Sequence, residues 1–261
     1  MCMLKICYRF MPLVCVFATL GSTRAATVSA GPTAILVELF TSEGCSDCPP
    51  ADAFLRTLDS TQPVPGAQLI VLEEHVDYWD DGGWRDPFSS HAFTVRQGDY
   101  VNRMRLASAY TPQMVVDGAY QFVGSDRQSA AKALEDARAT EKVGIRISAL
   151  QIEKGTVRAH VETDGVPSKA EMFVALVSEH AESQVARGEN GGRHLEHVAI
   201  ARNLMTVAKA AKGESLSKEI TLNTKSVAEQ GRLIVFLQEP NQGKILGAAV
   251  ERFNPPTESK Q

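Results

Sequence analysis

The feature that most constrains the fold of this chain is an apolar run followed by a cysteine pair and a helix start. Residues 33–40, TAILVELF, are nearly continuously apolar and include β-branched residues, which is typical of a buried strand. Cys45 and Cys48 come next, and Pro49-Pro50 follows them at a place where the first helical turn tolerates a missing N–H. The segment therefore predicts a central strand, a Cys-x-x-Cys pair and a helix that begins directly behind the pair.

The first residues have the pattern of a secretory signal peptide. Basic residues precede an apolar run over 10–20, and small residues near Ala25 and Ala30 offer cleavage frames. The run is shorter than the roughly 20 apolar residues that a membrane span needs. We therefore expect a signal peptide over 1–25, with residue 30 as the latest cleavage position, and a periplasmic or secreted protein without a stable membrane span after cleavage.

Removing this peptide would leave Cys45 and Cys48 as the only cysteines. The sequence has five cysteines, and the other three lie within the first 15 residues. An exported protein occupies a compartment where disulfides persist, so a single close pair there is informative. The formal charge is −4 and no dense run of Lys or Arg occurs. We therefore expect no nucleic-acid partner.

The chain up to residue 142 alternates predicted strands and helices. AQLIVLEEHVDYW (67–79) predicts a second strand that runs into a polar loop, and a helix is expected around 91–109. QMVVDGAYQFVG predicts a hairpin that turns at Asp117-Gly118. Ser125 or Asp126 then caps an Ala-rich helix.

From Val143 onwards the pattern changes to strands. GIRISALQIEKGTVRAHVETDG predicts a hairpin that turns near Lys154-Gly155, and EMFVALVSEH, SLSKEITLN, RLIVFLQE and KILGAAVERF add further strands. Residues 200–212 fit either a helix or a strand. The prediction is an α/β domain over 31–142, a mainly-β, sandwich-like domain over 143–254 and a flexible tail over 255–261.

The predicted order of elements around the cysteine pair resembles the thioredoxin fold. AILVELF resembles its central strand, and YTPQMVVDG (110–118) resembles its cis-proline loop. The chain is also similar to a family of secreted bacterial thioredoxin-like proteins of unknown function. ELFTSEGCSDCPPAD, HVDYWDDGGWRDPFSS and RGENGGRHLEH carry that similarity.

The resemblance implies a thiol–disulfide oxidoreductase. Cys45 would be the exposed nucleophile and Cys48 the resolving cysteine, since a helix N-terminus favours the thiolate. The resemblance further implies that Pro112 is cis and sets the backbone of Thr111 beside the sulfurs, with Glu38 as the buried acid. The expected partners are protein thiols or disulfides, or a redox partner protein, and no organic cofactor is needed.

Two other interpretations of the pair stay open at this point. The first is a structural or regulatory disulfide in a non-catalytic binding protein. The second is a Cu(I) carrier that uses both cysteines and His75, because soft thiolates and imidazole suit Cu(I). His75, Asp77 and Trp79 alternate, so they would share one face of an extended strand and form a proton relay, or else His75 is inert.

RGENGGRHLEH (187–197) is a polar, glycine-rich segment far from the cysteines in sequence. His194 and His197 would share one face of a helix, but a hairpin with solvated histidines fits the surrounding strands better. We expect this segment to dock on the α/β part of the chain near the cysteine pair.

Overall fold

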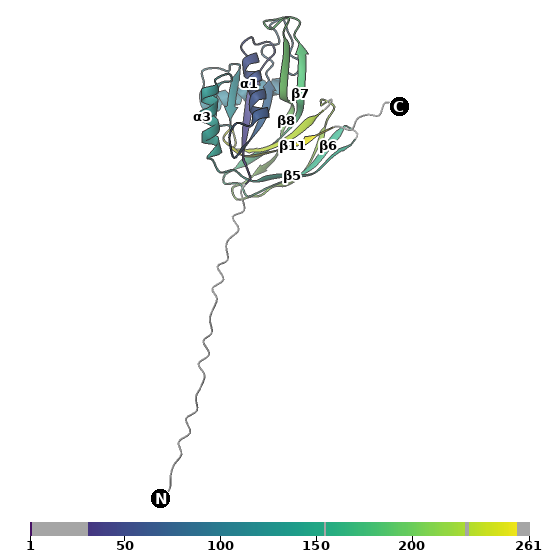
Figure 1. Ribbon diagram of the computed structural model, residues 1–261. Coiled ribbons are helices and arrows are strands. Elements are labelled where there is room, and N and C mark those ends of the chain that lie inside the picture. The colour runs from purple at the N-terminus through teal and green to yellow at the C-terminus, as the bar shows by residue number, and fades with distance from the viewer. Residues whose placement is uncertain (2–30, 154, 228–229, 255–261) are drawn as a thin grey trace. The chain divides into compact units, whose positions relative to one another are not determined.

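The computed structural model describes residue 1 and residues 31–153, 155–227 and 230–254 (Figure 1). The expected signal peptide from residue 2 onwards, Lys154 of the expected turn and the expected tail lie outside the described residues. The described residues from Pro32 to Asn254 belong to one compact unit. In the part of the chain that is described, no helix is both long enough and apolar enough to cross a membrane.

The first half of this unit alternates strands and helices, as the sequence predicts. In chain order the elements are β1 (Thr33–Thr41), α1 (Pro49–Thr61), β2 (Ala67–His75), α2 (His91–Met104), β3 (Gln113–Val116), β4 (Tyr120–Val123) and α3 (Arg127–Arg138). The two prolines occupy the first positions of α1, and Asp126 caps α3 by accepting hydrogen bonds from the backbone of the first turn. Asp117 and Gly118 both have positive φ in the β3–β4 turn.

The second half consists of strands. These are β5 (Ile145–Glu153), β6 (Thr156–Thr163), β7 (Ala170–Gln184), β8 (His194–Ala210), β9 (Ser217–Asn223), β10 (Gly231–Gln238) and β11 (Ile245–Phe253). The segment 200–212, which fitted either type of element, lies largely in β8. Because β8 pairs with β7 along most of its length, sheet pairing rather than helix propensity decides its conformation.

The strands of both halves form one large mixed sheet. Its order is β11-β10-β7-β8-β2-β1-β3-β4, with β1 parallel to β2 and β2 parallel to β8. A second sheet has the order β5-β6-β9. The protein is therefore a mixed α/β fold dominated by an eight-stranded sheet. A thioredoxin-like domain followed by a separate β domain is not confirmed by this arrangement, and the boundary between residues 142 and 143 stays a prediction.

Two apolar cores stabilise the protein, and they lie on opposite faces of the large sheet at β10. One contains the buried residues of β1, β2 and the three helices, and the other lies between β7 and β10 and the three-stranded sheet. Side chains of β10 contribute to both cores: Ile234 and Phe236 pack in the first, and Leu233 and Val235 pack in the second. This double burial explains why RLIVFLQ is almost continuously apolar in sequence.

A buried arginine connects the helical layer to the C-terminal strands. Arg232 of β10 is 1% exposed and donates hydrogen bonds of 2.7 Å to both carboxylate oxygens of Asp59 on α1. It also donates to Glu179 of β7 at 2.6 Å. Arg252 of β11 bonds to the same glutamate. Each carboxylate is thus held by at least one guanidinium, which is the geometry that makes a buried ion pair tolerable.

Replacing this arginine tests how strongly it joins the two halves. Arg232→Met leaves Asp59 and Glu179 in a mostly buried position without their main partner, so we expect a loss of about 3–5 kcal/mol in the free energy of unfolding. Urea denaturation followed by circular dichroism measures the loss. Arg146→Met, which removes exposed ion pairs to Glu162 and Asp164, is the matched control and should cost at most about 1 kcal/mol. Equal losses for the two variants would contradict the prediction.

The same network predicts a pH dependence of stability. Burial opposes ionisation of Glu179, but the hydrogen bond and charge of Arg232 together with Arg252 hold its pKa below the usual value. A lowered pKa contributes stability above the unfolded-state pKa of about 4.3, and this contribution is lost as the pH falls through the folded-state pKa.

We therefore expect Glu179→Gln to be less stable than the wild type near neutral pH, with a difference that shrinks in acid. Urea unfolding of both proteins across this range measures it. Glu251→Gln, at an exposed position of β11, is the control that shows the pH dependence caused by removing a surface carboxylate. A difference that does not change with pH would show that the charge of Glu179 does not contribute.

Candidate functional site

The cysteine pair lies at the N-terminus of α1, where the sequence places it. A disulfide joins Cys45 and Cys48, whose Cα atoms are 5.5 Å apart, and Cys48 is the N-cap residue of the helix. Cys45 was expected at an exposed tip, but it is only 1% exposed, and Cys48 is fully buried. Ser46 and Asp47 between them are the exposed residues of the motif. The surroundings of the pair therefore decide what can reach it.

The proline loop lies beside the cysteine segment. The Thr111–Pro112 peptide bond is cis, as the resemblance implied. A Cβ built on Gly124 would lie 3.0 Å from Cβ of Ala51 in α1 and 3.2 Å from Cβ of Pro112, so this proline packs close to the first turn of the helix. The indole N–H of Trp79 donates to Oγ1 of Thr111 at 2.8 Å.

Trp79 also approaches the cysteine segment directly. A Cβ added at Gly44, the residue before Cys45, would lie 2.9 Å from Cβ of Trp79 and 3.2 Å from its carbonyl oxygen. The absence of a side chain at Gly44 thus permits this close packing. Trp79 consequently packs against the cysteine segment at Gly44 and hydrogen-bonds to the proline loop at the same time.

The loop between β7 and β8 docks on the cysteine segment, and this sequence-based prediction is confirmed. The amide of Asn190 donates to the carbonyl oxygens of Glu43 and Cys45 at 2.8 Å each. The backbone N–H of Ser46 donates to the carboxylate of Glu189 at 3.2 Å. Asn190 is fully buried, so this contact is part of the interior.

Glu38 is not brought together with the cysteine pair. Its carboxylate accepts hydrogen bonds from Arg96 at 2.7 Å and from Tyr100 at 2.6 Å, both on α2. Thr41, three residues along β1, bonds instead to α1. Side chains three apart on a strand point to opposite faces, so Glu38 faces away from α1. This position gives its predicted role in proton transfer no support.

A different buried acid, Asp52, lies on the helix of the cysteine pair. It follows Cys48 by four residues and therefore shares its helix face, and its carboxylate accepts a 2.7 Å hydrogen bond from Oγ1 of Thr41. Burial and the nearby charge of Glu73 raise the pKa of Asp52 to about 7. Asp52 was not among the site residues predicted from the sequence, although an acid four residues after a helix-capping cysteine is a recognisable signal.

His75 ends β2 and is fully buried, but its carboxylate partner is not the expected one. The strand stops at His75, so Asp77 and Trp79 do not continue its face, and Asp77 bonds to Thr94 of α2. The Nδ1 atom of His75 lies 2.7 Å from Oδ2 of Asp86. Burial disfavours the charged ring, yet the Asp86 carboxylate raises the pKa of His75 to about 9.

His197 was expected in solvent and is instead buried. The hairpin itself is confirmed, since β7 and β8 pair directly on either side of the loop, and His194 is exposed. The Nδ1 atom of His197 lies 2.7 Å from Oε1 of Glu73 on β2, and the backbone N–H of Val198 donates to the other oxygen at 2.9 Å. Burial opposes protonation, but the charge of Glu73 raises the pKa of His197 well above its usual value.

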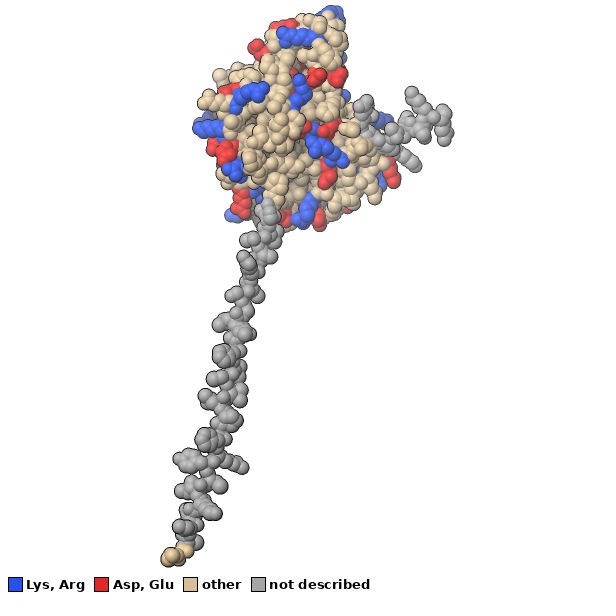
Figure 2. All heavy atoms as spheres, viewed as in Figure 1, with Lys and Arg blue, Asp and Glu red and all other residues tan. Residues whose placement is uncertain are grey.

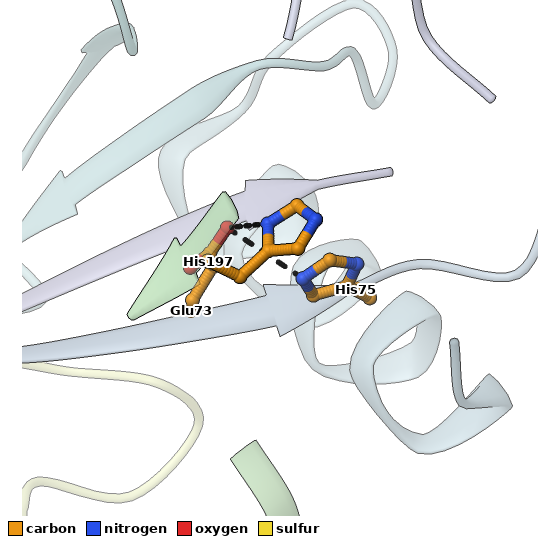
Figure 3. A group of neighbouring side chains, drawn as sticks. All are labelled: Glu73, His75 and His197. Carbon is orange, nitrogen blue, oxygen red and sulfur yellow. Dashed lines mark hydrogen bonds and ion pairs between the residues drawn. The ribbon is translucent and has the colours of Figure 1, made fainter. Parts of the chain in front are cut away.

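Glu73, His75 and His197 form a compact buried group (Figure 3). The two imidazole rings have centroids 4.7 Å apart, and Oε1 of Glu73 lies 3.6 Å from Nε2 of His75. Glu43 adds a further carboxylate, with Oε1 located 3.3 Å from Nε2 of His197. Among the described residues, no group of three or more candidate metal ligands includes the cysteine sulfurs, so the geometry gives the predicted copper site no support.

Comparison with known proteins places the chain in a family. Residues 36–238 match the family described as "Protein of unknown function (DUF1223)". The chain belongs to this family. The match spans both halves of the fold and contains the cysteine pair, the buried histidines and the loop that docks on the pair. No curated protein matched the chain.

A crystal structure of protein AGR_C_4864 from Agrobacterium tumefaciens is similar to this member of the family over most of its length. The identity is 22%, the TM-score is 0.66, and the alignment covers 89% of this chain and 99% of the other. This similarity shows a shared fold. A β-glucosidase from Kluyveromyces marxianus also aligned, at 13% identity over 60% of this chain and 16% of that chain, but its TM-score of 0.27 supports no structural argument.

The buried asparagine of the docked loop offers a direct test of this interface. Asn190→Ala removes the amide donor from the buried carbonyl oxygens of Glu43 and Cys45, of which the second keeps only the backbone N–H of Cys48, so we expect the free energy of unfolding to fall by about 1–3 kcal/mol. Gln184→Ala is the matched control, since its amide bonds to two loop carbonyls but is exposed. Denaturant unfolding gives the losses, and hydrogen exchange at residues 43–46 shows whether the cysteine segment loosens. If Asn190→Ala changed neither the free energy of unfolding nor hydrogen exchange at residues 43–46, the loop would not stabilise the cysteine segment.

Proposed function

We propose that this protein is an exported thiol–disulfide oxidoreductase built on a thioredoxin-like arrangement of β1, α1, β2 and the β3–β4 hairpin. The observation that carries the proposal is the placement of the Cys45–Cys48 disulfide at the N-terminus of α1, next to the cis Thr111–Pro112 loop. A helix N-terminus stabilises a thiolate, and a nearby second cysteine can resolve a mixed disulfide. The proposed location is the periplasm or the cell exterior.

The exchange reaction needs only the two cysteines and a dithiol. A substrate thiolate attacks Sγ of Cys45, the bond between the two cysteine sulfurs breaks, and Cys48 leaves as a thiolate. The second substrate thiolate then attacks the substrate sulfur of the mixed disulfide and releases Cys45. The substrate has lost two electrons to the cysteine pair, and the reverse sequence reduces a substrate disulfide.

Asp52 is the candidate to hold the proton that Cys48 exchanges in this cycle. It lies one helical turn after Cys48 on the same face, and it is 3% exposed. A carboxyl group that changes protonation near neutral pH is suited to accept a proton from a thiol and return it. Glu38 and His75, which the sequence analysis proposed for this role, have other partners.

Access to Cys45 is the step that the fold restricts. Trp79 packs over Gly44, and Asn190 holds the carbonyl oxygen of Cys45. We infer that a protein thiol reaches the buried sulfur only after the cysteine segment opens, which breaks the hydrogen bonds of Asn190 to this segment. On the face shown in Figure 2, acidic and basic side chains are intermixed, which supports a partner that is not selected by strong charge.

The burial of both cysteines favours a second candidate function. A disulfide with a nearly inaccessible first cysteine is also what a structural clamp would show, and the protein would then act as a binding protein through other surfaces. The reduction potential separates the two functions, because structural disulfides lie below roughly −300 mV and exchange-active ones above.

Trapping of a mixed disulfide tests the proposed activity. Cys48→Ser removes the resolving thiol, so we expect Cys45 to accumulate mixed disulfides with thiol partners in extracts of the exported fraction. These complexes should disappear on reduction and should be absent in the Cys45→Ser control. Non-reducing electrophoresis measures both, and titration against redox buffers gives the potential of the wild type. No trapped thiol together with a potential below about −300 mV would leave the structural disulfide as the function.

A further inference from the structure

Five buried residues form an alternating carboxylate–imidazole chain, part of which is drawn in Figure 3. Oδ2 of Asp86 lies 2.7 Å from Nδ1 of His75, and Nε2 of that ring lies 3.6 Å from Oε1 of Glu73. The same oxygen of Glu73 lies 2.7 Å from Nδ1 of His197, and Nε2 of that ring lies 3.3 Å from Oε1 of Glu43. Each imidazole therefore lies between two carboxylates, and all five residues are at most 2% exposed.

The carboxylate–imidazole chain ends at the segment that carries the cysteine pair. Glu43 precedes Cys45 by two residues, and its own backbone N–H donates to Oδ2 of Asp86 at 2.8 Å. Its second carboxylate oxygen accepts a 2.7 Å hydrogen bond from the indole of Trp84. The first and last members of the chain are thus bonded to each other, so the five residues form one closed unit that includes part of the cysteine segment.

Helix α1 presents Asp52 to the same side of the sheet. Thr41, whose hydroxyl donates to the Asp52 carboxylate, is the register partner of His75 in the parallel β1–β2 pair. Register partners point to the same face of a sheet, and residues two apart on a strand do so as well. His75 and Glu73 therefore point to the α1 side, where Asp52 lies.

β8 brings His197 to this side too. Arg56 of α1, one helical turn after Asp52, donates to the backbone carbonyl oxygen of Glu196, the residue before His197. The charged groups that bear on Asp52 through these contacts are Arg56 on α1, Glu43 after β1, Glu73 and His75 on β2, Asp86 before α2 and His197 on β8. The carboxyl group thus lies beside charges of both signs.

The charges of the chain act on Asp52 in opposite directions. Burial and the carboxylate of Glu73 raise the pKa of Asp52 to about 7, and the imidazolium charges of His197 and His75 oppose this rise. Although burial disfavours charged rings, Asp86 raises the pKa of His75 to about 9, and Glu73 raises the pKa of His197 well above its usual value. Both rings are therefore cations at the pH where Asp52 changes its charge.

We propose that the carboxylate–imidazole chain is a positioning element that controls the charge of Asp52 and thereby the pH range in which Cys48 exchanges its proton. This role rests on the thiol–disulfide exchange proposed above. When a substrate thiolate bonds to Cys45, the bond between the two cysteine sulfurs breaks, and Cys48 leaves with the electron pair and takes the proton of Asp52. Asp52 is then ionised and regains a proton from water.

Two variants of the chain should move the pKa of Asp52 in opposite directions. His197→Gln removes a cation, while Glu73 keeps its charge because the N–H of Val198 and the ring of His75 remain beside it. The pKa of Asp52 should then rise by at least about 1, since one neighbouring charge moves a carboxyl pKa by about 1–3. Glu73→Gln removes an anion and should lower the pKa of Asp52 by a similar amount. A loss of packing alone would not give opposite signs.

The pH profile of disulfide reduction shows the effect on exchange. The rate of reduction by dithiothreitol, divided by its thiolate concentration, should fall as the pH rises through the pKa of Asp52, because the ionised carboxylate has no proton for Cys48. The inflection should lie near pH 7 in the wild type, higher in His197→Gln and lower in Glu73→Gln, and Asp52→Asn should remove it. His194→Gln, at an exposed position of β8, is the matched control and should leave the profile unchanged.

Carbon-13 NMR of the aspartate carboxyl groups reads Asp52 directly in the oxidised protein and needs no change within the chain. Asp52→Asn identifies the resonance. In the wild type this resonance should titrate near pH 7, while proton–nitrogen spectra show both buried histidine rings still protonated. A neutral ring at pH 7, or an Asp52 that titrates in the usual acidic range, would overturn the proposal even where the variants do not fold.

The variants separate this role from the exchange activity itself. Shifts of the same sign in His197→Gln and Glu73→Gln, or no shift in either, would overturn the control of Asp52 by the chain. Opposite shifts in the NMR titration without any trapped thiol in Cys48→Ser would support that control and reject only thiol–disulfide exchange as its use.

Discussion

The large sheet depends on one buried carboxylate at the point where its two halves meet. β2 and β8 are parallel neighbours, and their register is fixed by Glu73 opposite Ile200. One carboxylate oxygen of Glu73 is hydrogen-bonded to Nδ1 of His197, and the other accepts the backbone N–H of Val198. The Glu73 side chain thus replaces backbone hydrogen bonds that join neighbouring strands elsewhere in the sheet. Placing a charge there is costly unless every oxygen is bonded, and here both oxygens have partners.

This junction also determines where the cysteine pair lies. β1 and β2 end side by side, with Thr41 opposite His75, so the segment from Ser42 to Cys48 begins next to His75. The loop that precedes β8 reaches the same place and fixes it through Asn190. The disulfide, the buried histidines and the docked loop are therefore neighbours because three chain segments converge at one edge of the sheet junction.

Sequence patterns predicted the positions of the helices and strands better than they predicted which strands pair with one another. The apolar run of β1, the prolines of α1 and the Asp117-Gly118 turn are local signals, and each gave the correct element. The confirmed docking of the 187–197 segment came from its unusual polar composition. Local patterns do not reveal that β8 adds to β2, since that pairing joins residues more than 120 positions apart.

The errors at the site follow from the same limitation. Glu38 was assigned to the cysteines because it lies in the central strand, but alternation along β1 directs it to Arg96 on the opposite face. His197 was expected in solvent because its neighbours are polar, whereas the β7–β8 register turns it inward to Glu73. In both cases the face of the sheet, which depends on distant pairing, decided the environment of the residue.

Helix α1 connects the cysteine pair at its N-terminus with the strands of the second half of the chain. At its N-terminus the preceding segment is held by Asn190, in its middle Arg56 donates to the carbonyl oxygen of Glu196, and near its end Asp59 binds Arg232. All three partners belong to the second half of the chain. Because the helix is fixed along its length, the proposed thiol exchange would require the cysteine segment to open by breaking contacts of the 187–193 loop rather than by moving α1. The energy of those contacts therefore sets how accessible Cys45 can become.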